Sequence, residues 1–179
     1  MVVTGKLTGV ATGAAGTVRK KAKGHFFAID RNRFQQVCPA LGMNPGVAYL
    51  VLTRFSGHDN RVTSASVRAV ETYTGISRGR AREAIHTLIA SKIITEIIDN
   101  SFPKYDLLSG VVEPEWIFLP NELVTGATDE TPPLEKVRQM GDPLILRLFI
   151  DLYSEQNLRE NCGIDRFILL QKYEREKIG

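Results

Sequence analysis

The chain has 179 residues, of which 43% are hydrophobic, enough for one ordinary domain or two small ones with a real core. No stretch approaches the roughly 18 to 20 consecutive apolar residues of a membrane span, and the N-terminus lacks a signal-peptide core, so we expect a cytoplasmic protein with no membrane partner. The two cysteines, Cys38 and Cys162, have no Cys or His neighbour at zinc-site spacing, so we expect reduced packing thiols and no metal.

The net charge of +3 conceals a strong asymmetry between the two halves of the chain. Residues 1–94 carry 14 Lys or Arg against 4 Asp or Glu, a balance of +10, whereas residues 95–179 carry 9 against 16, a balance of −7. Neutralisation of phosphates supplies most of the sequence-independent binding of nucleic acids. The asymmetry therefore predicts a polyanionic partner for the first half alone, the alternative being a dipolar surface without a function.

The N-terminal segment over 1–24 is rich in Gly, Thr and Ala, contains no acid, and lacks the apolar periodicity that packing requires. We predict a disordered basic arm whose DNA-binding side chains are Arg19, Lys20, Lys21 and Lys23. Residues 25–29 can then form a short strand, and Asp30 can cap a helix that runs through about Leu41. Pro39 is unfavourable in the last turn of that helix.

Two helices are predicted next. The first is a buried helix that has Pro45 in its first turn, where proline is accepted, and that Gly57 stops. The second has Ser64 as its N-cap and ends at Thr74-Gly75. Its inward residues are expected to be Val67, Val70 and Tyr73.

A third helix follows almost at once, because only Ile76 separates Gly75 from the next capping residue, Ser77. Its apolar residues recur at helical spacing up to Lys92: Ala81, Ile85, Leu88 and Ile89. Two helices joined by so short a turn must cross steeply. Residues 64–92 therefore predict a helix-turn-helix.

A hairpin is predicted directly after this motif. Residues 93–98 are β-branched, residues 99–101 favour a turn, and residues 104–108 can return as a second strand. In a DNA-binding domain a hairpin at this place is a wing. Lys104, near its tip, is a candidate phosphate contact.

At about 100° per residue, the second helix of the motif turns its apolar residues inward and places Gly79, Glu83 and His86 on the far side. Arg80 and Arg82 flank that outer face, and Arg78 lies in the first turn. Arg78, Arg80 and Arg82 offer forked donors to guanine edges and charge to phosphates. Since acids, not arginines, stabilise a first helical turn, these residues point to an anionic ligand. Gly79 is a poor helix former that permits close approach of a DNA backbone. The alternative is an ordinary solvated arginine face.

Other polar residues near the motif have two interpretations each. Glu83 either accepts from a cytosine amino group or orients an arginine, and His86 is either a surface residue or a contact. Arg61 and Arg68 are either phosphate contacts or exposed charges. The capping serines can also contact phosphate: Ser64, Ser66 and Ser77. Beside the arm, the predicted DNA-binding residues are Arg61, Ser66, Arg68, Ser77, Arg78, Gly79, Arg80, Arg82, Glu83 and Lys104.

Three stretches, YLVL at 49–52, DNR at 59–61 and YTGISRGRA at 73–81, carry a family resemblance. They resemble the winged helix-turn-helix family of bacterial and prophage DNA-binding proteins, with domains similar to those of replication initiators and of regulators of mobile elements. The resemblance covers residues 25–110 and continues more weakly through 117–121 and the segment near Asp142. It implies a DNA-binding fold and supports as the DNA face Ser77, Arg78, Gly79, Arg80 and Arg82.

The second half repeats an apolar pattern of the first. A shift of 98 positions aligns Pro45 with Pro143, Val47 with Ile145, Leu50 with Leu148, Val51 with Phe149, Leu52 with Ile150, Phe55 with Tyr153 and Ser56 with Ser154. Residues 164–173 then fall where the first copy has its next helix. The alternative is chance similarity of two amphipathic helices. The second copy lacks a recognition helix and a wing, which truncation of a longer protein would explain. Residues 125–133 look like a flexible connector.

The sequence thus predicts a mainly α, α+β fold in three parts: a basic arm at 1–24, a winged helix-turn-helix domain at 25–112, and an acidic, incomplete winged-helix-like region at 113–179. The predicted function is sequence-specific binding of double-stranded DNA by helix 77–91 and the wing, in replication initiation or transcription regulation. The alternative is an adaptor that uses 113–179 to bind a protein partner or a second copy. We expect neither a cofactor nor an enzyme, since no nucleophile with a base, phosphate loop or metal-ligand spacing is evident.

Overall fold

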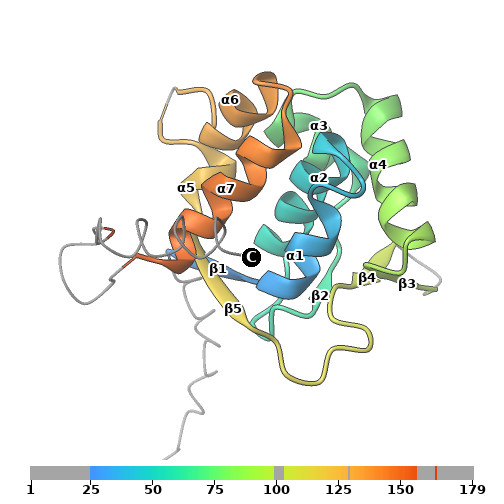
Figure 1. Cartoon of the computed structure of the whole chain (residues 1–179). Coiled ribbons are helices and arrows are strands. Elements are labelled where there is room, and N and C mark those ends of the chain that lie inside the picture. The colour runs from blue at the N-terminus through green and yellow to red at the C-terminus, as the bar shows by residue number, and fades with distance from the viewer. Residues whose placement is uncertain (1–24, 99–102, 129, 157–163, 165–179) are drawn as a thin grey trace, which may run out of the picture.

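The structure, a computed structural model, describes residues 25–98, 103–128, 130–156 and 164; the predicted basic arm and the predicted hairpin turn lie outside these ranges. The fold is mixed α+β with two small antiparallel sheets (Figure 1). In the portion of the chain that is described, none of the helices combines the length and apolarity needed for a membrane crossing.

The first strand and the capped helix after it are confirmed as β1 (Phe26–Asp30) and α1 (Arg31–Val37). The Asp30 carboxylate accepts from the backbone N–H of Arg33 at 2.9 Å and so caps α1. The predicted end at Leu41 is wrong, because α1 stops at Val37. Pro39 has no N–H to donate, and Cys38 before it is extended, as residues preceding proline usually are. The Cys38–Pro39 peptide bond is cis.

The predicted buried helix is α2 (Met43–Arg54), in which every residue from Pro45 to Thr53 is buried. A short strand follows it, β2 (Val62–Thr63). The sequence did not predict this strand, because two residues are too few to show an alternating pattern. The next helix, α3 (Val67–Thr74), begins later than predicted, with Ser66 rather than Ser64 as its N-cap. The hydroxyl of Thr63 accepts from the N–H of Ala65 at 3.2 Å, which favours the extended backbone before α3.

The next helix of the motif is α4 (Arg78–Ala90), separated from α3 by three residues. The predicted inward residues are buried at Ala81, Ile85 and Leu88 and half-buried at Ile89. The predicted hairpin strands are confirmed in shorter form as β3 (Thr95–Ile97) and β4 (Lys104–Asp106), which pair antiparallel. Because β4 also pairs with β2, the three-stranded sheet has the order β2-β4-β3.

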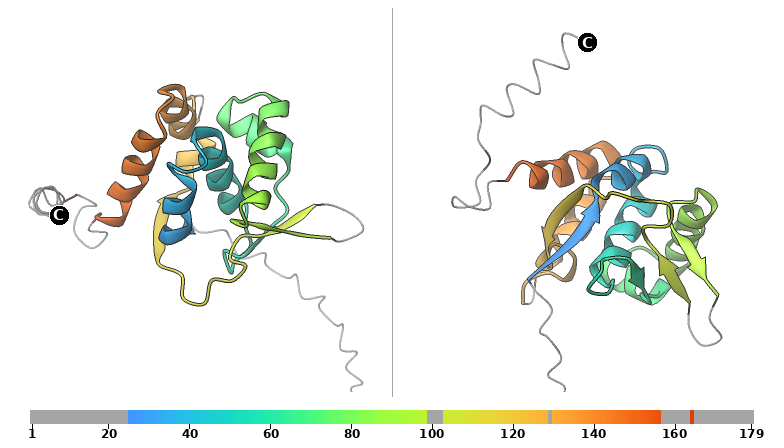
Figure 2. Two further views of the ribbon diagram at one scale, coloured as in Figure 1. Left: turned by 45° about the vertical axis from the view of Figure 1, so that its right-hand side comes forward. Right: turned by 90° about the horizontal axis from the view of Figure 1, so that it is seen from below.

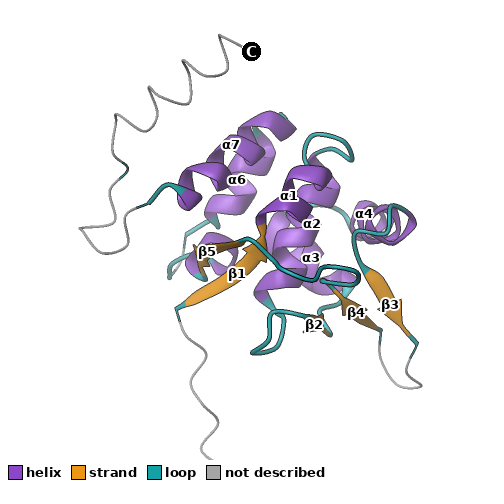
Figure 3. Cartoon of the chain, turned by 60° about the horizontal axis from the view of Figure 1, so that its bottom comes forward, coloured by secondary structure: helices purple, strands orange, loops and turns teal. Residues whose placement is uncertain are grey.

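The second half adds β5 (Trp116–Pro120), α5 (Glu122–Thr125), α6 (Pro133–Gln139) and α7 (Pro143–Ser154). β5 pairs antiparallel with β1 in a separate two-stranded sheet, which Figure 3 shows beside the three-stranded one. The expected connector over 125–133 is partly helical, since α5 ends at Thr125 and Pro133 opens α6. Proline is favoured at a first helical position because a backbone N–H there would have no partner within the helix, so its absence costs nothing.

One hydrophobic core joins the two halves of the described chain. It runs from Phe27 through the buried helix α2 to Ile117, Leu146 and Ile150. The expected boundary between 25–112 and 113–179 is therefore crossed by this core and by the β1–β5 pair. The views of Figure 2 place α4 and the β3–β4 hairpin at one end of the molecule and α7 at the other, with α1 and α2 between them.

Candidate nucleic-acid interface

The turn between α3 and α4 fixes the direction of α4. Gly75 lies in the left-handed region at φ 66° and ends α3, and its N–H donates to the carbonyl of Glu71 at 3.1 Å. The next residue, Ile76, is buried in the core. The hydroxyl of Thr74 donates to the carbonyl of Val70 at 2.6 Å, which satisfies a buried polar group at the turn. These contacts hold the start of α4 at a defined place on the surface.

The outer side of α4 is exposed and basic. The exposed residues of the helix and its N-cap are Ser77, Arg78, Gly79, Arg80, Arg82, Glu83, His86 and Ala90. In the ranges that the structure describes, no carboxylate lies within ion-pair distance of Arg78, Arg80 or Arg82. The three guanidinium groups therefore have their donors available for a ligand.

The first turn of α4 also offers backbone donors. Ser77 is the N-cap but makes no side-chain cap hydrogen bond, and the first backbone bond of the helix runs from the N–H of Ala81 to the carbonyl of Ser77. The N–H groups of Arg78, Gly79 and Arg80 thus precede the helical ladder. No acid lies in this turn. Free N–H groups and the positive end of the helix dipole together favour an anion.

Nothing in the described fold requires glycine at position 79. A Cβ atom built at Gly79 meets no heavy atom within 4 Å, and its φ lies outside the left-handed region. Glycine costs a helix roughly 0.5–1 kcal/mol relative to alanine. Gly79 therefore weakens α4 but avoids no clash within the described chain. Its presence is consistent with the close approach of a ligand to this position.

We therefore expect Gly79→Ala to raise the free energy of unfolding by about 0.5–1 kcal/mol while lowering affinity for duplex DNA. Urea unfolding and a binding titration measure the two effects. Gly75→Ala is the control and should lose stability, because Gly75 has φ +66° and a Cβ there would lie 2.9 Å from Cδ of Glu135. Unchanged DNA affinity in Gly79→Ala would contradict the close approach.

The hairpin holds two of the predicted site residues. Nη2 of Arg61 lies 3.2 Å from Oδ2 of Asp106, so Arg61 tethers the segment before β2 to the end of β4. Lys104 is half-buried on β4 opposite Ile97 of β3. The structure therefore gives Arg61 a partner within the chain, whereas the sequence suggested a phosphate contact or an exposed charge.

The remaining predicted contacts lie around α3 and α4. Ser66 and Arg68 are exposed at the start of α3, and the Ser66 side chain makes no capping bond. Within the described part of the chain Glu83 makes no ion pair, so its suggested orienting role toward an arginine is not seen. The predicted arm contacts at 19–23 lie outside the described residues.

Charge differs between two stretches of the chain. Residues 61–92, which include α3 and α4, hold six Lys or Arg and two Glu. Residues 113–156, which include α5, α6 and α7, hold three Lys or Arg and nine Asp or Glu. A polyanion is therefore attracted by the stretch that contains α3 and α4 and repelled by the stretch that contains α5, α6 and α7, of which α6 packs against α3.

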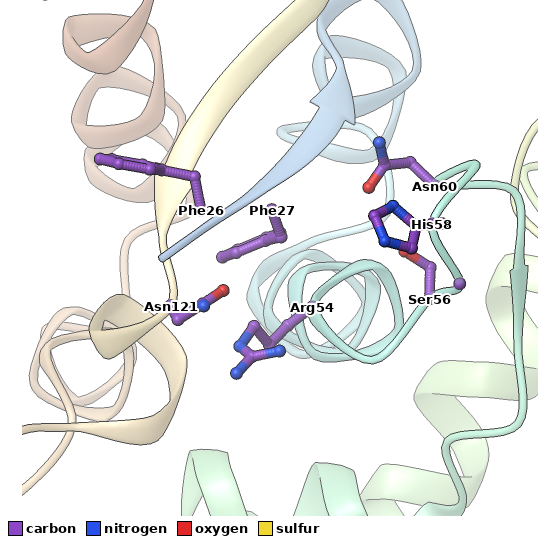
Figure 4. A pocket seen from close by; sticks show the side chains of 8 residues that line it. Phe26, Phe27, Arg54, Ser56, His58, Asn60 and Asn121 are labelled. Atoms are coloured by element: carbon purple, nitrogen blue, oxygen red, sulfur yellow. The ribbon is translucent and has the colours of Figure 1, made fainter. Parts of the chain in front are cut away.

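A cavity of about 250 Å³ lies between β1, the end of α2 and the loop that follows. Figure 4 shows its labelled side chains; the lining residues are Phe26, Phe27, Arg54, Ser56, Gly57, His58, Asn60 and Asn121. Burial lowers the pKa of the Arg54 guanidinium, which lies 5.3 Å from the ring centroid of Phe55. The Ser56 hydroxyl donates to the carbonyl of Thr53 at 2.6 Å, so it already has an acceptor. The lining carries cationic and amide groups and no carboxylate.

The sequence pattern did not reveal this cavity. It joins residues as distant as Phe26 and Asn121, which meet only because β1 pairs with β5. Cys38 is buried, and burial raises the pKa of its thiol to about 12. In the described ranges no three His, Cys, Asp or Glu residues form a group able to hold a metal ion.

Comparison with known proteins gives no match: no family model, no curated protein and no solved structure matches this chain.

Proposed function

We propose that residues 25–112 form a winged helix-turn-helix and that the protein binds double-stranded DNA, with α4 in the major groove. The order of elements supports this proposal: α2, β2, α3 and α4 are followed by the β3–β4 hairpin, and β2 joins the hairpin sheet. In such a domain the second helix of the motif reads base edges and the hairpin contacts the adjacent backbone.

The observation that carries the proposal is the outer face of α4. Three exposed arginines without ion pairs in the described chain surround a helix start that has no acid and no side-chain cap. Arginine forks match the O6 and N7 acceptors of guanine, and the free N–H groups match a phosphate. The basic arm over 1–24 adds a sequence-independent attraction to the backbone. The role is that of a replication-initiator-like protein or a transcription regulator.

Selection from a random duplex library tests the function directly. The full chain at physiological salt should enrich a defined motif and bind it at least about 10³-fold more tightly than a scrambled duplex. A palindromic motif indicates two copies on two half-sites, and an asymmetric motif indicates one. If no motif is enriched, α4 does not read sequence, and the adaptor function through the acidic region 113–179 becomes the better hypothesis.

A further inference from the structure

Helix α7 has a wide apolar side, only part of which is covered, and a polar side on which Arg147 pairs with Asp151 at 3.5 Å. Leu146 and Ile150 are fully buried against the core, whereas on another face of the helix Leu144, Ile145 and Leu148 are 55%, 40% and 60% exposed. The apolar side of an amphipathic helix normally packs against another element. The described part of the chain therefore leaves an apolar face of α7 without a covering element. We call Leu144, Ile145 and Leu148 the outer face of α7.

The surroundings of α7 resemble those of α2, which is buried from Pro45 to Thr53. Both helices have 12 residues, and in each an isolated antiparallel bridge begins two residues after the helix ends. The first bridge joins Ser56 to Thr63 and the second joins Gln156 to Ile164. The helix limits coincide at a shift of 100 residues, two more than the shift of 98 that the side-chain pattern predicted. The two helices therefore correspond in their limits and in the bridge that follows each of them, rather than in the aligned side-chain pattern.

The chain that follows the Ser56–Thr63 bridge covers α2. After Thr63 the chain continues into α3, which packs against α2 together with α4. After Ile164 the chain continues into a strongly apolar segment. Residues 164–173 hold six large apolar side chains: Ile164, Phe167, Ile168, Leu169, Leu170 and Tyr173.

We propose that residues 165–173 pack onto the outer face of α7, as α3 packs onto α2. The bridge between Gln156 and Ile164 brings the start of this segment close to the end of α7. A short tether gives the segment an effective concentration in the millimolar range, which a second copy does not reach in dilute solution. The segment 164–173 also carries two basic residues and one acid, whereas residues 113–156 are acidic by six charges, nine acids against three bases.

A photo-crosslinking residue placed at Leu148 in the full chain tests the occupant. Leu148 is 60% exposed, so the fold tolerates the change. We expect crosslinks within one chain to peptides that contain residues 165–173, identified by mass spectrometry. Crosslinks between two chains would make a second copy the occupant and overturn the proposal. Crosslinks to any other part of the same chain, or none at all, would overturn it as well.

Hydrogen exchange gives an independent measurement. In Leu148→Asp the backbone amides of 165–173 should exchange about tenfold faster than in the unchanged protein, while those of α4 keep their rates. Val112→Asp is the matched control, since it places the same charge at an apolar residue that is 93% exposed and lies outside α7. Equal exchange over 165–173 in both variants would refute the contact.

Discussion

Replacing Arg33 with alanine is expected to lower the free energy of unfolding by about 3–5 kcal/mol. Arg33 is only 8% exposed, and its guanidinium donates to the backbone carbonyls of Lys92, at 3.1 Å, and of Ile93 and Ser109. These carbonyls follow α4 and β4, so one side chain ties α1 to both ends of the hairpin. Alanine leaves these acceptors without their donor in a buried place.

Urea unfolding measures this loss, with Arg31→Ala as the control. Arg31 is on the same helix, but its ion pair with Glu115, at 2.9 Å, joins side chains that are 25% and 54% exposed. A pair so accessible to water contributes about 0–1 kcal/mol. Arg33→Met, which keeps most of the apolar volume, should still lose most of what alanine loses. If Arg33→Ala and Arg31→Ala lose equal stability, the carbonyl contacts contribute nothing.

The orientation of α4 could be predicted from the sequence because the information is local. Ala81, Ile85 and Leu88 recur at helical spacing, so burying them turns Arg80 and Glu83 outward whatever the rest of the chain does. The cap of α1 by Asp30 was predictable for the same reason, since the capping carboxylate reaches an N–H only three residues away.

Features that depend on long-range contacts were not predictable. The pairing of β1 with β5 joins Phe26 to Pro120, and a single sequence contains no signal for such a partner. Arg33 looked like another basic residue, but its acceptors lie about 60 and 76 positions further along the chain. The N-cap of α3 was misplaced because Ser64 and Ser66 both suit a cap, and the contact between Thr63 and Ala65 decides between them.

Replacing Arg80 with alanine is expected to cost about 1–3 kcal/mol in binding to the preferred duplex and to relax the base preference, if Arg80 makes a forked contact with a base. Arg80 is exposed on α4 and makes no ion pair in the described chain, so its removal should not disturb the fold. Mobility-shift titrations with the selected duplex and with single-base variants of it measure both effects.

Two further variants separate base reading from charge. Arg80→Lys keeps the charge but loses the fork, so it should retain the salt dependence of binding while losing the base preference. Arg147→Ala removes one positive charge from α7, at the other end of the molecule, and should change affinity by no more than about twofold. If Arg80→Lys keeps the full preference, Arg80 contacts phosphate rather than a base. If Arg147→Ala weakens binding as much as Arg80→Ala, the net charge and not the face of α4 governs the interaction.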